Sequence, residues 1–131
     1  MVKKIGDYML ERLIGHGNYG SVYGGYHITT RQPIAAKTVS INTLQGKLLQ
    51  QLESEIKVLK SLRNPYIIKL LEVYKTQNNV YLIMEHCSGG DLAEYLKKVG
   101  RVEETLAKRW LSQLVEAFCA CLLYTSDAAD E

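Results

Sequence analysis

Three glycines and one lysine are the residues of this chain whose types and spacing could hold a phosphate group. Gly15, Gly17 and Gly20 form a Gly-x-Gly-x-x-Gly motif, and Lys37 follows in a short run of β-forming residues. Glycine accepts positive φ angles and lets backbone N–H groups approach an anion closely, and Tyr19 within the motif could close over that anion. The lysine ammonium would supply the opposite charge.

The residues around the motif decide which kind of phosphate loop it is. Residues 21–27 are rich in β-forming side chains and include two adjacent glycines, which the first turn of a helix would resist. The motif therefore joins two strands, whereas in a dinucleotide-binding fold it joins a strand to a helix. The second common phosphate loop ends in Gly-Lys-Ser/Thr, and this tripeptide does not occur here. We predict a glycine-rich β-hairpin, with an ordinary hairpin that binds nothing as the alternative.

Lys37 needs an anionic partner if it is partly buried. Strand alternation places it on the same face as Ala35 and Val39. In a helix predicted at residues 48–63, Glu55 falls inside the stripe of apolar side chains, where an unpaired carboxylate is costly to bury. We therefore predict an ion pair between Lys37 and Glu55. The alternatives are a lysine that reaches water past its neighbours and a glutamate at the edge of the stripe.

The predicted elements form a small α+β lobe of five antiparallel strands and one helix. The strands are the two runs that flank the glycine motif, the run with Lys37, and residues 70–75 and 80–84. Residues 85–91 contain paired glycines and short polar side chains, which are typical of a hinge. Asp91 is predicted to cap a short helix that ends near Val99, and a longer amphipathic helix is predicted from Thr105 to about Ala120.

Residues 7–120 resemble the first half of a eukaryotic-type protein kinase domain. The resemblance lies in separate motifs: the glycine-rich loop, Ala-x-Lys at Ala35 and Lys37, the helix glutamate Glu55, the Asn-Pro segment at residues 64–70, and residues 80–92. It implies a kinase small lobe at residues 1–84, the hinge at 85–91, and the start of an incomplete large lobe at 92–120.

The resemblance implies that one group of residues binds the phosphates of ATP. The glycines and Tyr19 would cover the phosphates from above. Lys37 would hold the α- and β-phosphates while it is paired to Glu55.

A second group would bind the nucleoside. Its apolar side chains would pack on the adenine from above: Ile14, Val22 and Ala35. Met84 matches the gatekeeper position, and the backbones of Glu85 and Cys87 would form hydrogen bonds with the adenine edge. Asp91 would reach the ribose hydroxyls in addition to capping its helix.

Within this family, the stretches at residues 13–17 and 84–96 are most similar to the autophagy-initiating serine/threonine kinases. Such kinases transfer the γ-phosphate of ATP to protein, using a His-Arg-Asp loop and an Asp-Phe-Gly motif that binds Mg²⁺. Neither motif occurs in this sequence, so we expect no catalytic residue and no metal site in the chain, which would be inactive by itself. ATP and Mg²⁺ are expected cofactors of a full-length parent. The alternative parent is a pseudokinase that binds nucleotide or a partner without phosphotransfer.

Composition is that of an ordinary globular protein. The 131 residues are 47% hydrophobic with a formal net charge of +2, which gives no basic excess for nucleic-acid binding. No signal peptide or membrane-spanning run is visible, and three cysteines make no disulfide framework, so a cytoplasmic location is expected. Residues 121–131 resemble a translated sequencing adapter, and we expect them to be a non-native tail that ends the helical pattern.

Overall fold

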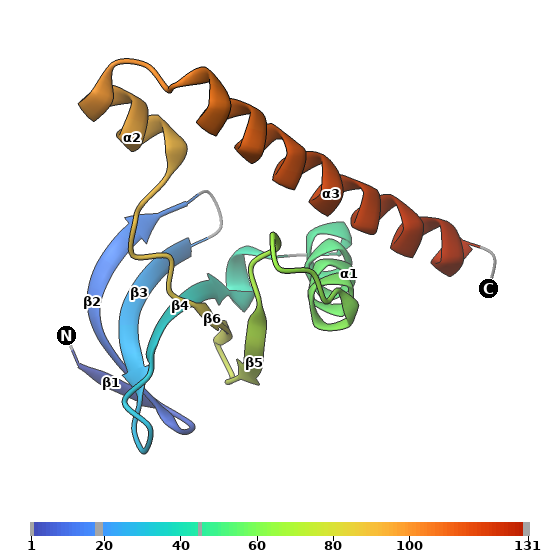
Figure 1. Ribbon diagram of the computed structural model, residues 1–131. Helices are drawn as coiled ribbons and strands as arrows, with labels where there is room; N and C mark the ends of the chain where they lie inside the picture. Colours follow the sequence, from blue (N-terminus) through green and yellow to red (C-terminus); the bar gives the residue numbers. More distant parts are fainter. Residues whose placement is uncertain (1, 18–19, 45, 130–131) are drawn as a thin grey trace. The chain divides into compact units, whose positions relative to one another are not determined.

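The structure is a computed structural model that describes residues 2–17, 20–44 and 46–129. The chain divides into two compact units (Figure 1). The first consists of Met1–Ser61 and Ile68–His86, and the second of Leu62–Ile67 and Cys87–Glu131. Each unit has its own architecture.

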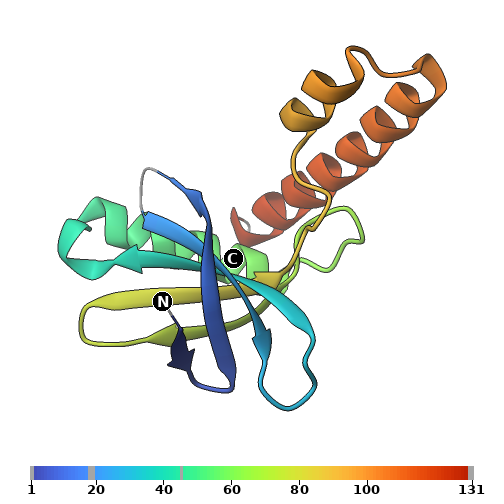
Figure 2. The same ribbon diagram turned by 90° about the vertical axis from the view of Figure 1, so that its left-hand side faces the viewer.

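The first unit is built on a curled antiparallel sheet, which confirms the predicted α+β class (Figure 2). Among the described residues its strand order is β1-β2-β3-β4-β6-β5. The strands are β1 Lys3–Ile5, β2 Tyr8–His16, β3 Gly20–His27, β4 Pro33–Ser40, β5 Leu70–Lys75 and β6 Asn79–Glu85. The prediction of five strands is therefore wrong by one. β1 was missed because three residues are too few to show an alternating pattern, and only Ile5 of the three is buried.

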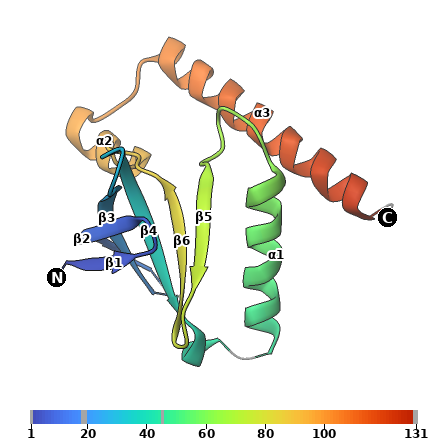
Figure 3. The same ribbon diagram turned by 90° about the horizontal axis from the view of Figure 1, so that it is seen from below.

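Helix α1, Lys47–Ser61, covers part of one face of this sheet and runs beside β5 (Figure 3). A short 3₁₀ turn, Ile41–Thr43, lies between β4 and the helix in the sequence. The helix ends two residues before the predicted end at Arg63, ahead of Pro65, which cannot continue a helix. One exposed ion pair joins the helix to the sheet, between Glu53 and Lys75 at 3.9 Å.

The sheet has a separate apolar core on each face. The core under α1 is formed by Ile56 together with sheet residues that include Leu70, Val80 and Leu82, and Leu52 and Leu59 of the helix pack against it. The opposite core is formed by the side chains of alternate residues, namely Ile5, Tyr8, Leu10, Ile34, Ala36, Tyr81 and Ile83. Because successive side chains of a strand point to opposite faces, this division fixes which face each residue of β4 and β6 occupies.

The second unit contains two helices, α2 Leu92–Val99 and α3 Glu104–Ala129. The Asp91 carboxylate accepts a hydrogen bond from the Glu94 N–H at 2.8 Å, which confirms the predicted cap, and Gly100 ends α2 with a φ of 81°. Tyr95 of α2 and Trp110 of α3 meet edge to face with ring centroids 5.5 Å apart. Trp110 is half-buried.

The prediction that the last helix ends near Ala120 is wrong, because α3 continues to Ala129. No glycine or proline interrupts residues 104–129, so nothing in the local sequence stops the backbone hydrogen bonds. The apolar side chains of Leu114 and Phe118 are exposed, with 67% and 64% of their surface accessible. In the part of the chain that the structure describes, none of the helices has the length and apolarity that a membrane crossing requires.

Candidate functional site

The glycine motif forms the hairpin between β2 and β3, as predicted from its strand context. The Gly17 N–H donates to the Gly20 carbonyl at 2.8 Å, and Gly15 lies opposite Val22 in the ladder. A hydrogen bond of 2.9 Å between His16 Nδ1 and Ser21 Oγ also crosses the hairpin. Tyr19, which was expected to cover the phosphates, lies outside the described residues.

The three glycines of the motif differ in whether the fold requires glycine at their position. A Cβ atom on Gly20 would overlap the carbonyl oxygen of Thr38 and lie 2.9 Å from its carbonyl carbon, so β3 could not pair closely with β4. At Gly15 and Gly17 the nearest atoms to such a Cβ would be 3.7 Å and 3.8 Å away, which is ordinary contact. The fold therefore requires only Gly20, and the other two glycines remain available for a role in binding.

The strand register brings four of the predicted site residues to one face of the sheet. Val22 of β3 lies opposite Lys37 of β4, and Ala35 lies opposite Met84 of β6. Residues directly opposite in an antiparallel pair share a face, so these side chains gather together. Lys37 also lies opposite Leu82, which belongs to the core under α1. The predicted placement of Lys37 on the face of Ala35 is confirmed.

Ile14 joins the same face from β2. A Cβ on Gly24 would lie 3.4 Å from Cγ2 of Ile14, and Gly24 is paired with Ala35. Ile14 therefore lies over the strand beside Ala35, on the face where a side chain of Gly24 would lie. Ile14 is 43% exposed, whereas Ala35 is buried. The result is an apolar patch made of Ile14, Val22, Ala35 and Met84.

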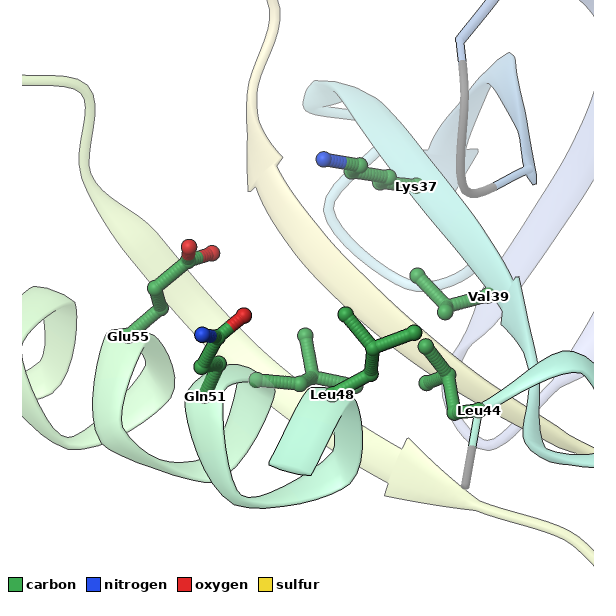
Figure 4. A pocket seen from close by; sticks show the side chains of 7 residues that line it. Lys37, Val39, Leu44, Leu48, Gln51 and Glu55 are labelled. Carbon is green, nitrogen blue, oxygen red and sulfur yellow. The ribbon is translucent and has the colours of Figure 1, made fainter. Parts of the chain in front are cut away.

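Lys37 and Glu55 line one small cavity beside this patch (Figure 4). Their charged groups point into the same space from β4 and α1, and the cavity also has Val39, Leu44 and apolar residues of α1 in its wall. Its volume of about 30 Å³ has room for a water molecule but is far too small for a nucleotide.

The prediction that Glu55 is buried in the apolar stripe is wrong, because its side chain is exposed. Ion pairs in the described part of the chain join Glu53 to Lys75 and Glu104 to Lys108, and Glu55 is in neither. The physical reason is its place at the edge of the stripe, since the neighbouring Ile56 is the residue of α1 that enters the core. The alternative of a glutamate that reaches water describes the structure, and its pairing with Lys37 stays a prediction.

Glu85, the last residue of β6, forms two hydrogen bonds with Lys69. Its N–H donates to the Lys69 carbonyl at 3.1 Å, and its carboxylate oxygen Oε1 accepts from the Lys69 N–H at 3.0 Å. The sequence predicted a role for the Glu85 backbone but gave no indication of one for its side chain. The partner lies 16 residues away, and only a predicted pairing of β5 with β6 could have suggested it.

Cys87 and Asp91 belong to the second unit, whereas the other described candidates belong to the first. The Cys87 carbonyl accepts a hydrogen bond from the Gly90 N–H at 3.3 Å, a turn that does not use the Cys87 N–H. Asp91 uses Oδ1 for the cap of α2 and keeps further acceptor capacity in its carboxylate. Both residues are exposed.

A magnesium ion, which the kinase resemblance implies, does not fit the residues described here. Within residues 2–17, 20–44 and 46–129, no group of three or more His, Cys, Asp or Glu residues is placed to hold a metal ion. Magnesium sites in ATP-using enzymes combine one or two carboxylates with substrate phosphates. In kinases such a carboxylate belongs to the Asp-Phe-Gly motif, which does not occur in this sequence, so we assign no metal ligand in this chain.

Comparison with known proteins identifies the family of this chain. The family model described as "Protein kinase domain" matches residues 8–123, which reach the first three residues of the expected non-native tail. The chain is also similar to the serine/threonine-protein kinase ATG1 of Mycosarcoma maydis, with 44% identity over 96 residues. That match covers 73% of this chain and 10% of the relative, so the chain spans about a tenth of the relative's length. The chain belongs to the protein kinase domain family.

Proposed function

We propose that this chain is the ATP-binding part of a serine/threonine protein kinase. The observation that carries the proposal is the single sheet face on which Lys37 lies beside an apolar patch, next to the glycine hairpin. A nucleotide needs this combination, because its base is flat and largely apolar while its phosphates are anionic. A hairpin with no ligand would not need a lysine at the border of an apolar face.

The patch residues Ile14, Val22, Ala35 and Met84 would contact the adenine ring. Gly15 and Gly17, which the fold does not require, would let the backbone approach the phosphates closely. Lys37 would hold the α- and β-phosphates, and Glu55 could orient its ammonium across the cavity that they share. A Cys87 backbone that binds the adenine edge and an Asp91 that reaches the ribose hydroxyls stay predictions from the kinase resemblance.

The full-length parent would transfer the γ-phosphate of ATP to serine or threonine of a protein substrate, in line with its similarity to a serine/threonine-protein kinase. It would act with Mg²⁺ in the manner of the autophagy-initiating kinases. Phosphoryl transfer depends on charge neutralisation and on a residue that orients the acceptor hydroxyl. This chain has neither an Asp-Phe-Gly nor a His-Arg-Asp motif, so it would bind nucleotide without transferring phosphate.

The test compares Lys37→Met with the control Lys4→Met, which removes an exposed strand lysine outside the site. Binding is measured by titrating a fluorescent ATP analogue, and folding by circular dichroism. We expect Lys37→Met to weaken binding roughly tenfold or more, equivalent to about 1.4 kcal/mol, and Lys4→Met to leave it unchanged. If both variants are folded and bind the analogue with equal affinity, Lys37 does not contribute to nucleotide binding.

The exposure of Glu55 favours a second candidate, a pseudokinase that binds nucleotide or a partner without phosphotransfer. Active kinases need the lysine and the helix glutamate to be paired. The downstream coding sequence distinguishes the two, because an active parent must supply His-Arg-Asp and Asp-Phe-Gly. A parent with both motifs that phosphorylates a generic protein substrate would contradict the pseudokinase.

A further inference from the structure

The two hydrogen bonds between Glu85 and Lys69 depart from a regular antiparallel ladder. Leu70 is paired with Met84, so Lys69 stands opposite Glu85 at the next position. In a regular hydrogen-bonded pair the two residues exchange both of their main-chain N–H···O bonds. Here the Glu85 N–H makes its main-chain bond to Lys69, whereas the Lys69 N–H donates to the Glu85 side chain.

The carboxylate therefore takes the place that the main-chain carbonyl of Glu85 would occupy in the ladder. A carboxylate is a stronger acceptor than a neutral carbonyl, so it can compete for this N–H even though Glu85 is exposed. Because the Lys69 N–H donates to the carboxylate, the Glu85 carbonyl is released from Lys69. The hydrogen bond from the Glu85 N–H to the Lys69 carbonyl keeps the end of β6 attached to the sheet.

We infer that the Glu85 side chain is a positioning residue that makes the Glu85 main-chain carbonyl available to the amino group of adenine, an inference that rests on the proposed function. Adenine carries an N–H donor at this position and guanine a carbonyl acceptor. A carbonyl held for the nucleotide accepts from adenine and faces an acceptor in guanine. The side chain of Glu85 thus sets the preference for ATP over GTP without touching the nucleotide.

Three variants test this role. Glu85→Ala removes the carboxylate, so the Lys69 N–H is left to recruit the Glu85 carbonyl back into the ladder. Glu85→Gln keeps an acceptor oxygen at the same place. Glu11→Ala is the matched control, because it removes another exposed carboxylate from a strand of the same sheet.

Affinities of the whole chain for ATP and GTP are measured by competition against the fluorescent analogue. In Glu85→Ala we expect the ratio of ATP to GTP affinity to fall about three- to tenfold, the worth of one hydrogen bond. The loss should come from ATP alone, because GTP gains nothing from the carbonyl. Glu85→Gln should recover most of the ratio, and Glu11→Ala should keep it.

A second measurement reports the hydrogen bond without nucleotide. The amide proton resonance of Lys69 should move in Glu85→Ala, which removes the acceptor of its hydrogen bond, and should move less in Glu85→Gln, which keeps an acceptor oxygen. If the Lys69 amide resonance is the same in Glu85→Ala as in the unmodified chain, or if Glu85→Ala keeps the ratio of ATP to GTP affinity, the positioning role alone is overturned. Failure of the unmodified chain to bind either nucleotide overturns the proposed function and, with it, this inference.

Discussion

Replacing each glycine of the hairpin by alanine separates the fold from the binding site. At Gly20 the new Cβ would overlap the Thr38 carbonyl oxygen and approach the carbonyl carbon to 2.9 Å. The obstacle is backbone, which cannot rotate away as a flexible side chain could, so β3 and β4 must move apart. At Gly15 and Gly17 the nearest atoms, at 3.7 Å and 3.8 Å, are at ordinary contact distance.

We expect Gly20→Ala to lower the free energy of unfolding by about 3 kcal/mol, the upper end of what overpacking costs. For a unit of this size the corresponding loss in Tm is more than about 10 °C. Gly15→Ala and Gly17→Ala should change stability by less than about 1 kcal/mol, because Gly to Ala also reduces the entropy of the unfolded chain. Gly25→Ala provides a second packing control, since its Cβ would overlap the Met9 carbonyl oxygen in the same sheet.

The assay is urea unfolding followed by far-ultraviolet circular dichroism, with binding of the fluorescent ATP analogue measured on each variant that folds. Gly15→Ala and Gly17→Ala should fold normally and bind the analogue more weakly, because a methyl group keeps phosphate oxygens away from the backbone. If Gly20→Ala proves as stable as Gly15→Ala, the reasoning from the β3–β4 contact is refuted.

Two further predictions concern a helix cap and a tyrosine. Asp91→Ala should destabilise α2 by about 1 kcal/mol and speed amide hydrogen exchange there, whereas Asp91→Ser should keep the cap; unchanged exchange in Asp91→Ala contradicts this. A hydrogen bond to the Glu72 carboxylate, with desolvation, raises the pKa of Tyr74 from 10.0 to about 12. Because the folded pKa is the higher one, this stabilisation is complete below pH 10 and is lost as pH rises to 12. Absorbance titration at alkaline pH should show tyrosine ionisation at about pH 12 that is lost in Tyr74→Phe. If every tyrosine ionises near pH 10, the prediction is contradicted.

Much of both units could be predicted because the signals in the sequence are local. The alternation in β4 assigned Lys37 to the face of Ala35, and that assignment depends only on strand geometry. The cap at Asp91 followed from one acceptor side chain placed before a helical run.

The incorrect predictions concern elements whose structure depends on a partner element or whose sequence shows no clear hydrophobic pattern. β1 is a strand only because it pairs with β2, and three residues carry no readable alternation. Glu55 lies at the edge of an apolar stripe, where helical periodicity does not decide between burial and water. The weaker apolar pattern after Ala120 predicts the end of the helix there, whereas α3 continues to Ala129.

The sequence by itself determined the glycine hairpin, the lysine on one sheet face and the helix that Asp91 caps, because each depends on neighbouring residues or on a fixed period. Only the tertiary structure decided why Gly20 must be glycine and how the Glu85 carboxylate replaces a main-chain carbonyl at Lys69. Both depend on strands that are distant in sequence and meet when the sheet forms. The face that brings Ile14, Val22, Ala35, Lys37 and Met84 together likewise exists only in the paired register of four strands.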